Sequence, residues 1–263
     1  MPEITTEDAT LHVEIDGSGD PVTVFAHGLT NSCQELAAFT PFLDGTKVRF
    51  DFRGHGRSSV PDAGSYRFVD FARDLDAVAS EFGATRAVGT SLGAGAITNL
   101  VARRPDRFER LVFLLPAALD VPLGDHEDFD RTAQLLESLP TDEAIEAILS
   151  SSGRAAAYER APWLREFDLL LWQDMNPVGV ARAIREVVRD VAVTDRDLLR
   201  AVHAPTMIIC RDGDSIHPAE LGRVLAHLMP NTELIVLSGE EELMTSIPML
   251  VGRVKGFLED GVA

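Results

Sequence analysis

The chain has 263 residues, which is enough for one α/β domain with an insertion. Its formal net charge of −18 disfavours nucleic acids and anionic membrane surfaces as partners, because both would be repelled. The N-terminal stretch "MPEITTEDAT" is acidic where a signal peptide would be basic, and no apolar run approaches the length of a membrane span. Two cysteines, Cys33 and Cys210, are too few for a disulfide framework, so we expect a cytoplasmic protein. We expect its partner to be a small molecule and not a nucleic acid or a membrane.

Short apolar runs alternate with helical patterns along most of the chain. Amphipathic helices are predicted over 67–82, followed by Gly83 as a C-terminal cap, and over 247–258, because apolar residues recur there every three or four positions. Buried strands are predicted at 22–28, 47–52, 86–91, 110–116, 206–210 and 233–239. This alternation predicts an α/β fold with a mostly parallel, doubly wound sheet.

The stretch 118–203 breaks the alternation, since it has helix-start signals, at Thr141 and at Thr194, but no strand pattern. We expect it to form a helical lid over a core made of residues 1–117 and 204–263. The large apolar side chains of this lid are expected either to shape a pocket or to pack against the sheet: Trp163, Phe167, Leu170, Leu171, Trp172 and Met175.

The segment "GTSLGAG" places Ser91 between two glycines, directly after a predicted strand and before a predicted helix. This is the setting of a nucleophile elbow, in which Gly89 and Gly93 allow strand and helix to approach closely around a strained serine. The N-terminus of the following helix would direct unpaired N–H groups and positive potential at a developing oxyanion. The alternative is a glycine-rich turn in which the serine only caps the helix.

Two further motifs end predicted strands, "HGLT" at 27–30 and "DFRGHGRS" at 51–58. With these, the sequence resembles the α/β-hydrolase superfamily, in its single-domain esterase and lactonase-like branch. The resemblance implies that the backbone N–H groups of Leu29 and Leu92 form the oxyanion hole. It also implies structural roles for His27 and His55, and it implies no cofactor; the sequence contains no cluster that indicates a metal.

The segment "PTMIICRDGDSIHP" at 205–218 resembles the strand and loop that carry the catalytic carboxylate in this superfamily. Its register from Pro205 to Pro218 assigns that role to Asp214, with Asp212 as the competitor. The order of serine before aspartate also suits the fold.

The catalytic base is the departure from the pattern. The superfamily carries a histidine just after the last strand, and Glu241 stands there instead, while the last histidine in the chain is His227. In a first interpretation Glu241 is itself the base and titrates together with Asp214. The alternative is that Glu241 is an ordinary exposed acid in a solvated turn, because residues 240–242 are all glutamate.

In a second interpretation His217, three residues after Asp214, approaches Ser91 from a different side, although a lone loop histidine is often exposed. His126 is a remote alternative, and His227 is expected to face solvent from a helix over 218–229. In a third, the fold binds a small apolar ligand or performs a non-hydrolytic step.

The sequence thus predicts a serine hydrolase of small esters, lactones or related acyl compounds, with Ser91 as nucleophile, Asp214 as orienting acid and a non-standard base. The alternative is a non-hydrolytic or catalytically silent ligand-binding protein on the same fold.

Overall fold

A computed structural model describes residues 2–123, 126–151 and 155–259. Its described part contains one sheet of eight strands in the order β1-β2-β4-β3-β5-β6-β7-β8, in which β1, β2 and β4 pair antiparallel and the remaining pairs are parallel. The predicted α/β fold with a mostly parallel sheet is therefore confirmed. The strands are β1 (Glu3–Thr5), β2 (Thr10–Gly17), β3 (Val22–Ala26), β4 (Thr46–Phe50), β5 (Arg86–Thr90), β6 (Arg110–Leu114), β7 (Thr206–Arg211) and β8 (Thr232–Leu237).

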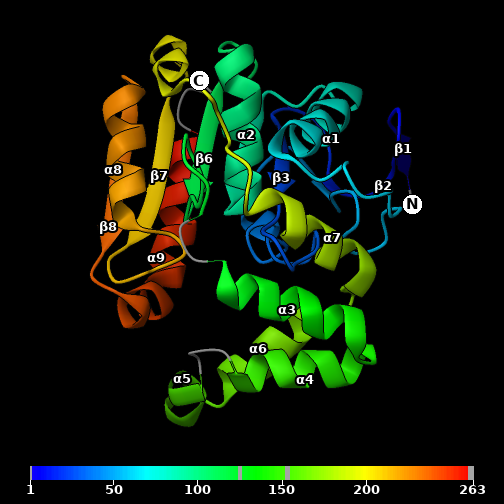
Figure 1. Ribbon diagram of the computed structural model, residues 1–263. Coiled ribbons are helices and arrows are strands. Elements are labelled where there is room, and N and C mark those ends of the chain that lie inside the picture. The colour runs from blue at the N-terminus through cyan, green and yellow to red at the C-terminus, as the bar shows by residue number, and fades with distance from the viewer. Residues whose placement is uncertain (1, 124–125, 152–154, 260–263) are drawn as a thin grey trace.

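Helices cover both faces of this sheet (Figure 1). Successive residues of a strand point to opposite faces, so Ala87 packs into one apolar core and the adjacent Val88 into the other. The first core is shared with α1 (Phe68–Glu81), α2 (Leu92–Arg103) and α8 (Ala219–Leu228), and the second with α9 (Glu240–Glu259). Gly83 follows α1 with φ of 64°, the left-handed conformation expected of a C-terminal glycine. Within the described ranges, no helix is long and apolar enough to cross a membrane.

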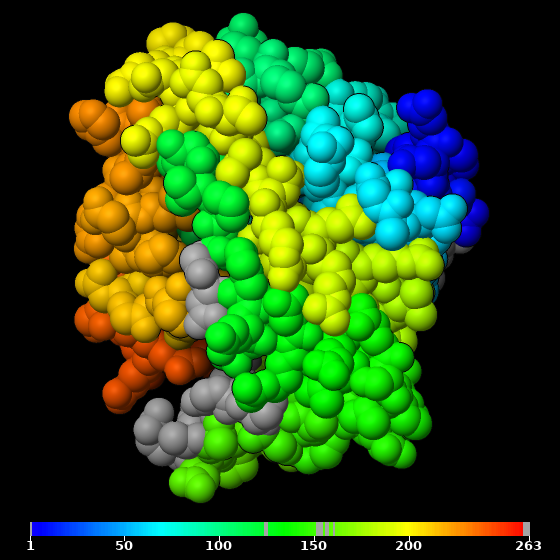
Figure 2. All heavy atoms as spheres, in the orientation of Figure 1, coloured from blue at the N-terminus to red at the C-terminus, as the bar shows by residue number. Residues whose placement is uncertain are grey.

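The described residues between β6 and β7 form helices joined by turns and loops, with no strand among them. This segment contains α3 (Glu127–Ser138), α4 (Thr141–Ser151), α5 (Ala155–Arg160), α6 (Trp163–Trp172), α7 (Pro177–Val187) and the 3-10 helix η2 (Arg196–Ala201); a second 3-10 helix, η1 (Thr40–Phe42), follows β3. Helices α3 to α6 lie together below the sheet in the view of Figure 1, and the lower green surface of Figure 2 belongs to this part of the chain. The expected cap at Thr194 is wrong, because the Asp195 side chain accepts the Asp197 N–H at the start of η2.

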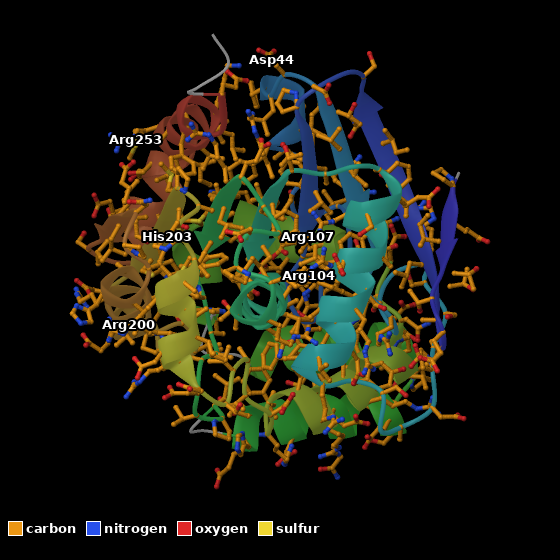
Figure 3. The ribbon with its side chains drawn as sticks, turned by 90° about the horizontal axis from the view of Figure 1, so that it is seen from above. Asp44, Arg104, Arg107, Arg200, His203 and Arg253 are labelled. Atoms are coloured by element: carbon orange, nitrogen blue, oxygen red, sulfur yellow. The ribbon has the colours of Figure 1, made fainter. Side chains whose placement is uncertain are left out.

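A buried ion pair joins the loop after β4 to α1. The Arg53 guanidinium, 1% exposed, donates to both carboxylate oxygens of the fully buried Asp74 at 2.7 and 2.9 Å. The Arg53 backbone N–H adds a third bond to Asp74 at 3.1 Å. On the same helix, Asp76 binds Arg104 and Arg107 at the surface, and both arginines are labelled in Figure 3.

We expect Asp74→Ala to lower the free energy of unfolding by about 3–5 kcal/mol, because it leaves a guanidinium buried without its bidentate partner. Asp76→Ala is the matched control on the same helix, and it should cost less, because Asp76 is 26% exposed and water can replace its carboxylate at the exposed Arg104. Urea denaturation of both variants measures the difference. Equal losses in the two variants would contradict this assignment of stability to the buried pair.

Candidate active site

Ser91 occupies a sharp turn between β5 and α2. Its backbone has φ of 49° and ψ of −104°, a strained conformation for a residue with a side chain. The two flanking glycines are required by space: a Cβ on Gly89 would lie 2.6 Å from the Gly93 carbonyl carbon, and a Cβ on Gly93 would lie 2.1 Å from the Ala26 oxygen. The local geometry is that of the predicted elbow, which exposes the Ser91 hydroxyl at the carboxyl edge of the sheet.

His217 lies beside this hydroxyl. Its Nε2 atom is 3.0 Å from the Ser91 Oγ, and its Nδ1 atom is 3.1 Å from Oδ2 of Asp214. An ionised carboxylate only accepts hydrogen bonds, so the Nδ1–H must donate to Asp214. The lone pair of Nε2 is then directed at the Ser91 hydroxyl, which is the orientation that a general base requires.

Asp214 is held in place by the loop that also carries His217. Its Oδ1 accepts the backbone N–H groups of Ile216 and His217 at 3.0 and 2.9 Å, while its Oδ2 accepts from the Arg211 Nε at 2.8 Å. Burial would raise the pKa of Asp214, but the hydrogen bonds and charge of His217 and the bond from Arg211 hold that pKa well below its usual range. A bridge between Arg211 and Pro218 closes the loop, so the acid and the imidazole are fixed within one short turn.

The competing carboxylate, Asp212, points elsewhere. Its side chain is 54% exposed and forms an ion pair with Arg223 at 3.2 Å. Of the two aspartates, only Asp214 contacts His217, in agreement with the register drawn from the sequence.

The two residues that the resemblance names as oxyanion donors are Leu29 and Leu92. Leu92 is the first residue of α2, so its N–H belongs to the helix N-terminus, where such groups have no intrahelical partner. Leu29 lies in the loop after β3, and both leucines line the same cavity as Ser91. These positions are where the resemblance assigns the oxyanion donors.

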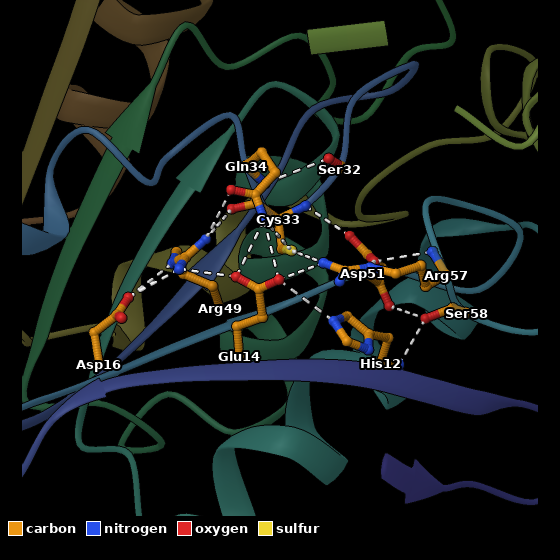
Figure 4. Close-up of polar contacts among 10 residues, drawn as sticks. All are labelled: His12, Glu14, Asp16, Ser32, Cys33, Gln34, Arg49, Asp51, Arg57 and Ser58. Atoms are coloured by element: carbon orange, nitrogen blue, oxygen red, sulfur yellow. Dashed lines mark hydrogen bonds and ion pairs between the residues drawn. The ribbon is translucent and has the colours of Figure 1, made fainter. Parts of the chain in front are cut away.

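A buried polar network anchors the loop that carries Leu29 (Figure 4). Asp51, which is fully buried, accepts the backbone N–H groups of Cys33 at 2.7 Å and Arg57 at 3.0 Å. His27 completes the anchor, because its Nδ1 donates to the Gly28 oxygen at 2.8 Å and its Nε2 accepts the Phe52 N–H at 3.0 Å. Burial lowers the pKa of His27, so its imidazole is neutral and its role is structural.

Three potential metal ligands meet in this network: His12, Glu14 and Cys33 lie with ligand atoms within 4.8 Å of one another. Burial opposes ionisation of Glu14, but the hydrogen bond from Arg57 and the charge of Arg49 lower its pKa to about 2. Burial and the nearby Asp51 and Glu14 raise the pKa of Cys33, so its thiol stays protonated. Cations already satisfy the carboxylate, and the arrangement favours an ion-pair network over a metal site.

A cavity of about 440 Å³ opens above Ser91 and His217, between the sheet and the helical layer. Three of the six large apolar residues named from the sequence, Phe167, Leu171 and Trp172 of α6, line this cavity, as expected of residues that shape a pocket. The other three residues do not, for two reasons. Trp163 and Leu170 are 52% and 62% exposed on the outer side of α6, and Met175 is buried in the core of the helical layer.

The structure does not bring Glu241 into this site. Glu241 lies exposed in the first turn of α9, and the carboxylate that lines the cavity is its neighbour Glu240, which pairs with Arg211 at 3.5 Å. Nor do the remaining histidine candidates line the cavity: His126 precedes α3, and His227 is exposed on α8 as expected. The residues brought together are Ser91, His217 and Asp214.

A sheet of this order, with a strained serine between β5 and α2 and a histidine–aspartate pair after β7, defines an α/β hydrolase. The family model of the α/β hydrolase fold matches residues 21–244, and the chain belongs to this family.

Similar proteins cover nearly the whole chain. The 2-(acetamidomethylene)succinate hydrolase of Mesorhizobium japonicum is 26% identical over 90% of this chain and 87% of its own. A non-heme haloperoxidase of Rhodococcus erythropolis is 28% identical over 94% of both chains. The crystal structure of the enol-lactonase from Burkholderia xenovorans LB400 superposes with a TM-score of 0.80 at 21% identity, covering 98% of this chain and all of the other.

Proposed function

We propose that the protein is a serine hydrolase of small esters, lactones or related acyl compounds, and that His217 is its base. One observation carries the proposal: the His217 imidazole bridges the Ser91 hydroxyl and the Asp214 carboxylate at 3.0 and 3.1 Å. The base therefore comes from the loop after β7, and the turn after β8, where the superfamily pattern has it, contributes none.

The reaction follows from this arrangement. The Ser91 Oγ attacks the acyl carbon while His217 takes its proton, and Asp214 stabilises the imidazolium that forms. The negative charge moves to the carbonyl oxygen, where the proposed donors, the N–H groups of Leu29 and Leu92, stabilise it. Collapse breaks the bond to the alcohol, which takes the proton from His217. Water, deprotonated by the same imidazole, then releases the acid from Ser91.

The cavity favours a compact, mostly apolar acyl compound. Its volume of about 440 Å³ lies in the range of small-molecule sites, and most of its wall is aliphatic or aromatic. Two similar proteins, a succinate-derivative hydrolase and an enol-lactonase, support hydrolysis of small acyl substrates.

Labelling with a fluorescent organophosphonate tests the proposal. The probe should label the protein at neutral pH, and Ser91→Ala should abolish labelling, because oxyanion donors alone do not remove the serine proton. Ser215→Ala, which removes an exposed hydroxyl from the loop of Asp214, is the matched control and should label normally. Persistent labelling of Ser91→Ala would overturn the assignment. No labelling of the unmodified protein, even at mildly alkaline pH, would favour a ligand-binding function.

A further inference from the structure

The ionisable side chains around the cavity are predominantly acidic. Among the described lining residues these are Glu35, Asp168, Arg211, His217 and Glu240. The guanidinium of Arg211 is already committed, since it binds Asp214 at 2.7 Å and Glu240 at 3.5 Å. Asp168 is buried beneath the Tyr158 hydroxyl, which donates to it at 2.7 Å. A substrate anion would therefore meet no cation that is not already paired with a carboxylate within the described lining.

Among these acids, Glu35 contacts the loop after β3, which carries the proposed oxyanion donor Leu29. Its two carboxylate oxygens accept the Gly28 N–H and the Asn31 side-chain N–H, both at 2.6 Å. Both donors are neutral, and the described chain places no cation in contact with Glu35. Burial raises the pKa of Glu35 to about 7, although the bonds from Gly28 and Asn31 oppose this rise.

The position of Glu35 determines which part of a substrate meets it. Gly28 directly precedes Leu29, the proposed oxyanion donor, so the carboxylate lies against the loop that would hold the substrate carbonyl. An acyl chain bound at Ser91 lies in the same mostly apolar cavity as the Glu35 carboxylate. Like charges brought together in such a space repel strongly, since the low dielectric does not screen them.

We propose that Glu35 is a specificity-determining residue which makes the site select esters with uncharged acyl groups and reject those whose acyl chain carries a carboxylate. This inference rests on the proposed ester hydrolysis at Ser91 and deepens it by naming the substrate class. Selection acts through charge, so the ratio of kcat/KM for a neutral and an anionic substrate of equal shape reports it directly.

Two p-nitrophenyl esters provide that ratio: the hexanoate, and the mono-ester of adipic acid, which has a carboxylate in place of the terminal methyl. The unmodified enzyme should prefer the hexanoate by about tenfold or more at mildly alkaline pH, and Glu35→Gln should reduce this preference several-fold. Glutamine is accommodated without loss of the Gly28 bond, because the buried Asn31 Oδ1 has no partner and can accept the new N–H after rotation of the amide. Glu166→Gln, an exposed acid on the cavity-covering α6, is the matched control and should leave the ratio unchanged.

The pH dependence of the ratio is an independent readout that needs no variant. Between about pH 6 and about pH 8 the unmodified enzyme should become more selective against the adipate ester as Glu35 ionises, whereas the ratio for Glu35→Gln should stay flat. Both reactions need the same base, His217, so this requirement cancels in the ratio.

A ratio near one for the unmodified enzyme, or one that neither Glu35→Gln nor pH changes, would overturn the inference while hydrolysis that depends on Ser91 still stood. Hydrolysis that survives Ser91→Ala, or no turnover of either ester, would overturn the proposed function and this inference with it.

Discussion

Replacing His217 by alanine is expected to lower kcat/KM for small activated esters by roughly 10⁴- to 10⁶-fold, about 5–8 kcal/mol of transition-state stabilisation. The imidazole is the only group within hydrogen-bond distance of the Ser91 Oγ in the described structure, so no other side chain is placed to remove its proton. Steady-state hydrolysis of p-nitrophenyl acetate measures the loss. Because the His217 side chain is only 19% exposed, thermal unfolding of the variant is needed to show that the fold is retained.

The position after β8 supplies the control for this experiment. Glu241→His places an imidazole in the exposed first turn of α9, so it should neither raise the activity of the parent nor rescue His217→Ala. Glu241→Gln should leave kcat/KM within about twofold of the parent, because a solvated surface charge contributes little. If Glu241→His restores activity to His217→Ala, the turn after β8 can deliver a base and the assignment to the loop after β7 is wrong. Activity that survives in His217→Ala alone would contradict it as well.

The fold could be predicted because each buried strand is recognisable from its own short run of residues. Strands covered by helices on both faces are continuous apolar runs, and all six that were predicted correspond to β3 to β8. Strands β1 and β2 were missed, since half-buried and exposed residues alternate along "EIDG" in β2, which pairs antiparallel near the sheet edge. The last helix begins at Glu240 and not at Ile247, because three glutamates in a first turn favour the positive end of the helix dipole.

Only the parts of the site that depend on the spacing of neighbouring residues could be predicted from the sequence. The elbow glycines and the spacing that selected Asp214 are constraints on neighbouring residues, which a sequence displays directly. The choice between Glu241 and His217 is different in kind, since it depends on the direction in which a loop folds. The Asp214 Oδ1 accepts the N–H groups of residues 216 and 217 and turns the loop back on itself, which is what carries the imidazole to Ser91. An aspartate followed three residues later by histidine was the available signal.

Glu35 was missed altogether. A glutamate in a loop is ordinarily solvated, and nothing in "NSCQEL" distinguishes it from a surface acid. Its position in the cavity wall arises from the return of the loop to its own start, where the carboxylate binds the Gly28 N–H. Such a contact is a property of the closed loop and has no periodicity for a sequence to show.

Asp214→Asn should lower kcat by roughly 10⁴-fold, because it changes the tautomer of the base without emptying the site. The amide oxygen must stay with the backbone N–H groups of Ile216 and His217, which leaves the amide NH₂ facing the His217 Nδ1. Two donors cannot face each other, so Nδ1 loses its proton and Nε2 carries one towards Ser91, where it no longer accepts. The same replacement at Asp212, an exposed aspartate of the same loop, should change kcat by less than about twofold.

Stability separates this electronic effect from collapse of the loop. Both variants lose the bonds from Arg211 to Oδ2, but Asp214→Asn keeps both backbone bonds of the turn, whereas Asp214→Ala removes them and should cost about 1–2 kcal/mol more. If the aspartate only shaped the loop, the asparagine variant would retain activity within about tenfold and the alanine variant would lose it in proportion to its instability. A loss of activity in Asp214→Asn far beyond its loss of stability is therefore the result that assigns Asp214 to the base, because that variant keeps the backbone bonds of the turn and changes the protonation of His217.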